Sequence, residues 1–207
     1  TYGQASWELV RKSGLVQEIR LRNKLAGIPW EHHLFLCRPQ APELGDAVFL
    51  YIGGDYRPGD EFRGLEVAQK LRAPVALLFE VALFDWWEDD LIVYTFRRYI
   101  EEEDLDWPLL FPMVSSVLSA MEALEEYMGE QGVSPEGPPF RGPKRGWTTY
   151  LSAAAAPGKV LGIAPLMLDK LNIEAQVGHQ VNLWGMFPSA FPLVAEELLV
   201  AGTISGE

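Results

Sequence analysis

An apolar strand, an amphipathic helix and a second apolar strand follow one another between residues 47 and 79, and this succession most constrains the fold. Residues 47–52 (Ala-Val-Phe-Leu-Tyr-Ile) and 75–79 (Val-Ala-Leu-Leu-Phe) are continuous apolar runs of strand length. Between them, apolar residues recur at helical spacing over 61–71, and Pro74 follows as a stop signal. Strands that are apolar throughout are typical of a parallel sheet covered on both faces. The sequence therefore predicts an α/β fold.

Further segments extend this pattern on both sides. The apolar run 33–37 predicts a strand that neighbours 47–52 across a turn containing Pro and Gly. Residues 7–23 show no clean period, and we expect a strand or an irregular segment there. Later segments predict helices over 89–101, 112–128, 146–156 and 193–201, and a short buried strand over 160–164. With 207 residues, of which 48% are hydrophobic, we expect an N-terminal segment over 1–29 and one domain over 30–207.

Residues 132–143 lie where a central strand would be expected if strands and helices continued to alternate along the chain. This stretch contains Pro135, Pro138, Pro139 and Pro143. Proline has no N–H and cannot donate to a sheet ladder. The sequence therefore predicts a Pro/Gly-rich loop here, or at best an edge strand.

Charge and apolar patterning exclude several classes of partner. Seventeen basic and twenty-nine acidic residues give a net charge of −12, which opposes attraction to phosphate backbones, so nucleic acid is not an expected partner. No apolar run approaches the roughly 20 residues that span a bilayer, so no membrane-spanning segment is expected.

The residues that could bind a metal are few and poorly placed. Cys37 is the single cysteine, which rules out an internal disulfide, and its apolar surroundings predict a buried structural thiol. His32 and His33 are adjacent, so on a strand they point to opposite faces and cannot share one ion. We therefore expect no metal and no cofactor.

Residues 141–147, Arg-Gly-Pro-Lys-Arg-Gly-Trp, have the form of a strand-to-helix turn that lacks a nucleophile. In a hydrolase, such a turn projects a hydroxyl or thiol, while nearby backbone N–H groups face the developing oxyanion. Pro143 stands where a serine would be expected, and proline supplies neither a nucleophile nor an N–H. A basic loop that leads into a helix is the alternative interpretation of the same residues.

Several short motifs occur in a characteristic order between Trp30 and Gly185. They are Trp30-Glu31-His32-His33, Tyr51-Ile52-Gly53-Gly54, Trp87-Glu88-Asp89-Asp90, Pro112-Met113-Val114, Lys144-Arg145-Gly146-Trp147-Thr148-Thr149, Pro165-Leu166-Met167-Leu168-Asp169-Lys170-Leu171-Asn172 and His179-Gln180. This series resembles the PhoPQ-activated pathogenicity-related protein family. The resemblance implies an α/β-hydrolase fold, which would be only partly represented here as a mostly parallel sheet flanked by helices.

The resemblance also implies catalytic parts that this chain does not show. In the family, an apolar strand ending in Gly-Ala-Ser precedes the Lys-Arg-Gly-Trp motif, with the serine as nucleophile. Here the three corresponding positions are Arg141, Gly142 and Pro143, so Gly142, Pro143 and Lys144 form a degenerate elbow. Family members continue into further strands that would carry the triad acid and histidine, and the chain stops soon after His179.

Six residues are candidates for a residual oxyanion-like site or pocket. They are Gly53, Gly54, Lys144, Arg145, Asp169 and His179. Gly53 and Gly54 follow an apolar strand, where hydrolases place the second oxyanion N–H, although glycine pairs are also common in turns. His179 could act as a base only with a nucleophile in hydrogen-bond reach. Asp169 and Asn172 are expected to satisfy backbone groups at a strand-to-helix transition.

Three functional hypotheses follow. The leading one is an α/β-hydrolase-like pseudoenzyme that acts as a structural or protein-interaction subunit. The second is a true serine hydrolase of the same family, seen as a truncated or imperfectly determined chain. The third is a small-molecule binding module that uses a pocket near Gly53, Lys144 and His179.

An incomplete sheet leaves a strand edge and apolar faces uncovered. We therefore expect another protein chain, or the remainder of a longer one, to cover the sheet, with the apolar segment 187–201 in contact with it. The sequence leaves the compartment unknown. The resemblance implies export for bacterial family members, and no signal peptide is visible in this chain.

Overall fold

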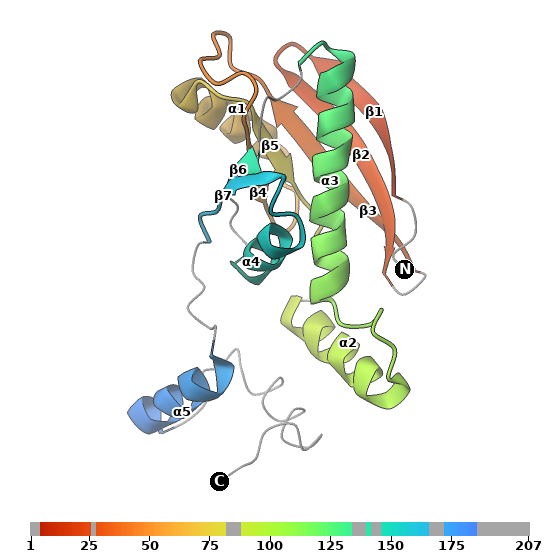
Figure 1. The fold of residues 1–207 in the computed structure, drawn as a ribbon, viewed down its shortest axis with the longest axis vertical. Helices are drawn as coiled ribbons and strands as arrows, with labels where there is room; N and C mark the ends of the chain where they lie inside the picture. The colour runs from red at the N-terminus through yellow and green to blue at the C-terminus, as the bar shows by residue number, and fades with distance from the viewer. Residues whose placement is uncertain are drawn as a thin grey trace.

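The computed structural model describes residues 5–25, 28–81, 88–133, 140–141, 146–165 and 172–185 (Figure 1). In chain order its elements are β1 Ser6–Ser13, β2 Val16–Leu25, β3 Ile28–Cys37, β4 Val48–Ile52, α1 Asp60–Leu71, β5 Val75–Leu78, α2 Glu88–Glu102, α3 Leu110–Glu130, β6 Phe140–Arg141, α4 Gly146–Ala155, β7 Val160–Gly162 and α5 Ile173–Trp184. The helices predicted over 61–71, 89–101, 112–128 and 146–156 are confirmed as α1 to α4. The helix predicted over 193–201 lies outside the described residues.

The strands form one mixed sheet of seven strands in the order β1-β2-β3-β5-β4-β6-β7. The pairs β1–β2, β2–β3 and β3–β5 are antiparallel. The pairs β5–β4, β4–β6 and β6–β7 are parallel. The expected α/β class is confirmed, and the parallel half with its crossed β5-β4 pair has the α/β-hydrolase-like arrangement. Residues 6–25, which we assigned to a separate N-terminal segment, contribute β1 and β2 to the same sheet.

The predicted pairing of the 33–37 and 47–52 strands is wrong, because β5 lies between β3 and β4. Leu34 pairs with Leu78 in the antiparallel β3–β5 ladder, and Leu78 pairs with Ile52 in the parallel β5–β4 ladder. The connection 38–47 is longer than the roughly 2–5 residues of a hairpin loop, so it can pass over one strand position. The β4–α1–β5 crossover then places β5 in the gap.

The interpretation of 132–143 as a loop or at best an edge strand is also wrong for Phe140 and Arg141, which form β6. Phe140 pairs with Val48 on one side and with Val160 on the other, so β6 lies inside the sheet. The backbone N–H of Phe140 donates to the carbonyl of Lys159 at 3.2 Å. The prolines flank this two-residue strand instead of occupying it, which leaves its ladder donors intact.

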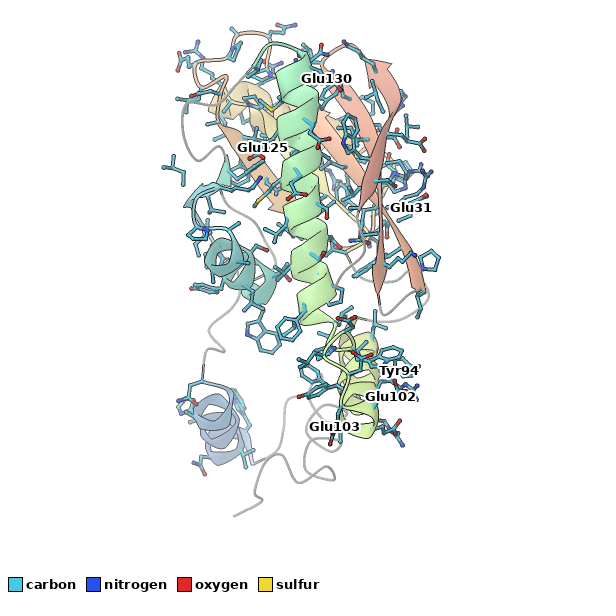
Figure 2. The ribbon with its side chains drawn as sticks, turned by 45° about the vertical axis from the view of Figure 1, so that its right-hand side comes forward. Glu31, Tyr94, Glu102, Glu103, Glu125 and Glu130 are labelled. Atoms are coloured by element: carbon cyan, nitrogen blue, oxygen red, sulfur yellow. The ribbon has the colours of Figure 1, made fainter. Side chains whose placement is uncertain are left out.

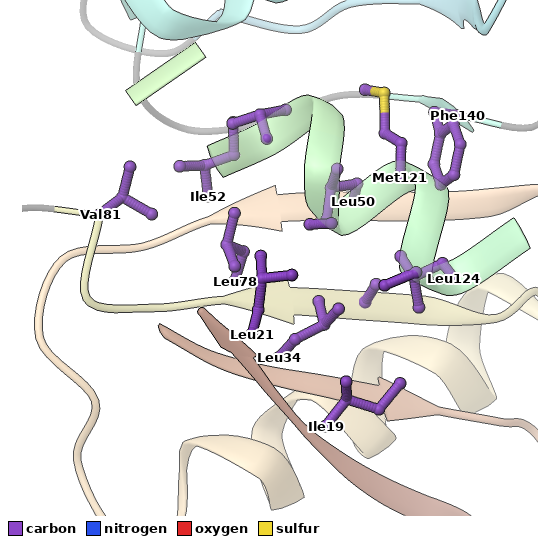
Figure 3. Close-up of a cluster of buried hydrophobic side chains, with 14 of the residues drawn as sticks. Ile19, Leu21, Leu34, Leu50, Ile52, Leu78, Val81, Met121, Leu124 and Phe140 are labelled. Atoms are coloured by element: carbon purple, nitrogen blue, oxygen red, sulfur yellow. The ribbon is translucent and has the colours of Figure 1, made fainter. Parts of the chain in front are cut away.

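Two apolar clusters cover the two faces of the sheet. The larger one joins strand residues such as Leu50 and Phe140 to Met121 and Leu124 of α3, as Figure 3 shows. The smaller one lies under α1, where Ala68 packs among residues that include Phe35 and Val75. At the far edge, β7 is less covered than predicted, since Leu161 is 53% exposed. The strand expected over 160–164 is therefore confirmed as β7, whereas its expected burial is wrong.

Two helical glycines give a test of this packing. A Cβ on Gly64 of α1 would lie 2.5 Å from Cδ1 of Leu77, whereas a Cβ on Gly129 of α3 would meet nothing within 4 Å. Gly64→Ala is expected to lower the free energy of unfolding by about 1–3 kcal/mol through overpacking, partly offset by better helix propensity. Gly129→Ala is expected to raise it by up to about 1 kcal/mol. Urea unfolding followed by circular dichroism measures both, and shifts of the same sign would contradict the packing of α1.

Candidate functional site

The candidate site lies at the carboxyl ends of the parallel strands β4, β5 and β6, where α/β proteins bind their ligands. Three connections meet there: residues 53–59 after β4, residues 79–81 after β5, and residues 142–145 between β6 and α4. The last connection joins β6, an interior parallel strand next to the edge strand β7, to a helix, and a nucleophile elbow also joins a parallel strand to a helix. The elbow at this connection stays a prediction.

The elbow residues Gly142, Pro143, Lys144 and Arg145 lie outside the described residues, and so does Asp169. The flanking elements still bound the turn, because β6 ends at Arg141 and α4 begins at Gly146. No residue between these bounds has a hydroxyl or thiol.

Hydroxyl side chains of α4 itself are buried. Thr148, Thr149 and Ser152 are 1%, 1% and 2% exposed. Ser152 lies in the second turn of α4, and its Oγ is shielded from solvent. These hydroxyls lie inside the fold and are not exposed as a nucleophile would be.

Gly53 has a structural role that explains why a glycine is present. Its N–H donates to the carbonyl of Leu78 at 2.7 Å, which extends the β4–β5 ladder by one residue. A Cβ at Gly53 would lie 2.6 Å from the ring of Phe79. The carbonyl of Gly54 accepts the N–H of Glu80 at 2.8 Å. The turn interpretation of this glycine pair thus has direct geometric support, whereas its oxyanion role stays a prediction.

Glu80 holds this end of the sheet together, and sequence reasoning missed it. Its backbone has a left-handed φ of 61°, and its side chain is 1% exposed. Oε1 of Glu80 accepts the backbone N–H of Tyr56 at 2.9 Å. The backbone carbonyl of Glu80 accepts the indole N–H of Trp30 at 2.9 Å. Burial raises the pKa of the Glu80 carboxyl. The only sequence signal was a glutamate directly after the apolar run 75–79.

His32 belongs to a buried polar network that ties β2, β3, β5 and α3 together. It is fully buried, with Nδ1 2.8 Å from the carbonyl of Glu80 and Nε2 3.1 Å from Oδ1 of Asn23. Asn23 Nδ2 donates to Ser116 Oγ at 2.7 Å, and that hydroxyl donates to the carbonyl of Pro112 at 2.9 Å. Burial lowers the pKa of His32 to about 4.

His33 faces the other side of the sheet. Its ring stacks on Tyr56 at a centroid distance of 5.0 Å, and its Nδ1 lies 3.3 Å from Oε1 of Glu18. The opposite orientation of His32 and His33 is thereby confirmed. Among the described residues, no group of three or more His, Cys, Asp and Glu side chains could hold a metal ion.

Cys37 is fully buried, and its thiol donates to the carbonyl of Glu61 at 3.4 Å. Burial raises the pKa of this thiol to about 12, so it stays protonated and unreactive near neutral pH. The prediction of a buried structural thiol is confirmed.

His179 is not brought to the elbow by the described structure. It is exposed on α5, and α5 lies apart from α4 in both Figure 1 and Figure 2. Asn172 caps α5 by accepting the N–H of Ala175 at 3.1 Å, as expected for a strand-to-helix transition.

In the part of the chain that the structure describes, no helix is long and apolar enough to cross a membrane.

The sequence profile of the PhoPQ-activated pathogenicity-related protein family matches residues 16–199 of the chain. Among curated proteins, autocrine proliferation repressor protein A of Dictyostelium discoideum is 27% identical over 174 residues. This alignment covers 75% of the chain and 35% of the relative, so the chain spans about a third of that relative's length.

Solved esterase and hydrolase structures show more distant likenesses. An acetyl xylan esterase from Paenibacillus has a TM-score of 0.47 at 8% identity, covering 95% of this chain and 61% of that one. The BES protein from Bacillus cereus has a TM-score of 0.47 at 10% identity, covering 96% and 73%. Dienelactone hydrolase from Anabaena variabilis has a TM-score of 0.42 at 13% identity, covering 73% and 63%.

Proposed function

Because the chain belongs to the PhoPQ-activated pathogenicity-related protein family, we propose that it is an α/β-hydrolase-like pseudoenzyme that acts as a structural or protein-interaction subunit. The observation that carries this proposal is the turn between β6 and α4. In an active serine hydrolase, this turn presents the nucleophile. Here it consists of Gly142, Pro143, Lys144 and Arg145, none of which has a hydroxyl or thiol.

The arrangement around the turn supports the loss of acyl-transfer chemistry. The N–H of Gly53 is engaged by the carbonyl of Leu78 at the place where a second oxyanion donor would be expected. The two described histidines of the sheet are both engaged in other contacts. His32 is enclosed in its own network, and His33 stacks on Tyr56.

The interaction role is supported by the open edge of the sheet. Within the described residues, β7 pairs with β6 on one side only. Leu161 in β7 and Ile163 just after it are 53% and 37% exposed, and their i, i+2 spacing is that of one strand face. An exposed edge with apolar side chains is a site for pairing with further polypeptide. We propose that another protein chain covers this edge and the adjacent face.

A fluorophosphonate probe tests the proposal directly, because it labels activated serines. We expect no labelling of the purified chain, and hydrolysis of p-nitrophenyl acetate within about tenfold of the uncatalysed rate, since enzymes typically accelerate reactions by a factor of about 10⁶ or more. A known serine hydrolase treated in parallel controls for probe quality. Stoichiometric labelling at any serine would overturn the pseudoenzyme proposal.

The rival proposal is a true serine hydrolase, which is favoured by the connection from the parallel strand β6 to the helix α4. Intact mass and peptide sequencing across residues 130–145 separate the two. An apolar strand ending in serine at that place would support the hydrolase. Confirmation of Arg141-Gly142-Pro143 would rule out a serine elbow at this turn.

A further inference from the structure

The negative charge of the chain is concentrated in one part of the fold. Residues 88–133, which form α2, α3 and their connection, contain twelve carboxylates and two arginines, a net charge of −10. The whole chain has a net charge of −12. Everything outside α2, α3 and their connection is therefore close to neutral, and the molecule has a strongly negative side.

The connection between α2 and α3 also exposes apolar side chains. We define the α2–α3 corner as residues 94–111. Ile100 is 43% exposed, Leu105 65% and Phe111 46%. These residues lie at the end of α2, in the connection and at the start of α3. Figure 2 shows Tyr94, Glu102 and Glu103 gathered on this corner, at the opposite end of α3 from Glu130.

Contacts within the corner hold several of its side chains in place. Arg98 lies 5.1 Å above the ring of Trp107, and the indole N–H of Trp107 donates to Oε2 of Glu102 at 2.6 Å. Tyr94 meets Trp107 edge-on at 6.0 Å. On the inner side, the N–H of Leu109 donates to Oγ1 of Thr95 at 3.2 Å. The surface is thus preorganised before any partner arrives.

Internal ion pairs neutralise only part of the corner's charge. Arg97 pairs with Glu101 at 3.2 Å, and Arg98 pairs with Glu101 and Glu102. Residues 97–106 contain five carboxylates and these two arginines, which leaves a net charge of −3. Glu103 and Asp104 are exposed and lie between the apolar residues Ile100 and Leu105 in the sequence. The described carboxylates do not converge on a metal-binding geometry, so the surface is not organised around an ion.

From this pattern we propose that the α2–α3 corner is a docking surface for a cationic polypeptide segment with apolar anchor residues. Leu105, Ile100 and Phe111 would form the buried centre of the contact, and the carboxylates would form its polar rim. A second copy of this chain is a poor occupant, because its net charge of −12 repels the corner. This proposal is independent of whether the β6–α4 turn is catalytic.

The test uses a labelled synthetic peptide of leucine and lysine in amphipathic helical spacing, about 16 residues long. Its affinity for the full chain is measured by fluorescence anisotropy, and its position by hydrogen exchange. We expect increased protection over residues 97–111 and an affinity that falls as salt is raised. Protection confined to other parts of the chain would overturn the proposal.

Two double variants with the same charge change separate specific docking from general attraction. Glu103→Lys with Asp104→Lys is expected to weaken peptide binding by about tenfold or more. Glu66→Lys with Glu130→Lys replaces exposed carboxylates on α1 and at the far end of α3, and is expected to weaken it by less than about threefold. Equal weakening by both pairs would show that net charge alone attracts the peptide. Leu105→Ser tests the apolar anchor and should weaken binding by about fivefold.

Discussion

Replacing Phe140 with alanine is expected to lower the free energy of unfolding by about 3–5 kcal/mol. Phe140 is 2% exposed and belongs to the larger core cluster, where it packs in the neighbourhood of Leu50 and Met121 (Figure 3). Its backbone lies between β4 and β7, so neighbouring strands restrict how far the site can collapse around the cavity. Urea unfolding monitored by far-ultraviolet circular dichroism measures the change.

Phe62→Ala is the matched control. Phe62 is on α1 and is 64% exposed, so its truncation should change stability by less than about 0.5 kcal/mol. The comparison keeps the chemical change constant and varies only burial. If the two variants were equally stable, Phe140 would not lie in the core, and residues 132–143 would be the surface loop that the proline content predicts.

Local patterns predicted α1 to α4, because each of these helices repeats its signal over many residues, whereas α5 was not predicted. In α3, the side chains of Met113, Val117, Met121 and Leu124 are buried and spaced by three or four positions. Such a stripe is readable without knowledge of the partner surface. The same holds for the continuous apolar runs that became β4 and β5.

Strand pairing was not predictable in the same way, because it depends on contacts distant in sequence. The β3–β5 ladder joins Cys37 to Val75, and no local feature of either run specifies the other. For β6, the surrounding prolines gave a strong local signal against a strand, yet a two-residue ladder needs only that Phe140 and Arg141 are not proline.

The buried polar groups were the least predictable part of the candidate site. Glu80 and His32 are residue types that are usually exposed or half-exposed, so sequence alone gives no reason to place them in the core. Their burial follows from β3 lying next to β5, which brings the carbonyl of Glu80 within 2.8 Å of the His32 ring. Because the sequence did not predict the β3–β5 pairing, it also did not predict the contact between His32 and Glu80.

The stability of the protein is expected to fall as the pH is lowered from about 6.5 to about 4, because His32 is held neutral in the fold. Burial lowers the pKa of His32 from 6.5 to about 4. In this window the unfolded chain binds a proton that the folded chain does not, so acid favours unfolding. A pKa difference of this size corresponds to at most about 3 kcal/mol of unfolding free energy.

Glu80 acts in the opposite direction, so the pH dependence of the unaltered protein alone does not isolate His32. The pKa of Glu80 is raised in the fold. The folded chain therefore binds more protons than the unfolded chain above pH 4.5, and Glu80 contributes stability that is lost as the pH rises through its folded pKa. The informative quantity is the difference in pH dependence between the unaltered chain and His32→Gln, since Glu80 is present in both.

The His32→Gln variant should lose most of the decline in stability between pH 6.5 and pH 4, whatever its absolute stability. His179→Gln, at an exposed position on α5, should retain it. Urea unfolding at a series of pH values gives both curves. Both ring nitrogens of His32 face oxygen atoms, the carbonyl of Glu80 and Oδ1 of Asn23, so a neutral ring donates a hydrogen bond to only one of them. If His32→Gln left the decline unchanged, the folded ring would instead be cationic, with both N–H groups donating to the oxygens of Glu80 and Asn23.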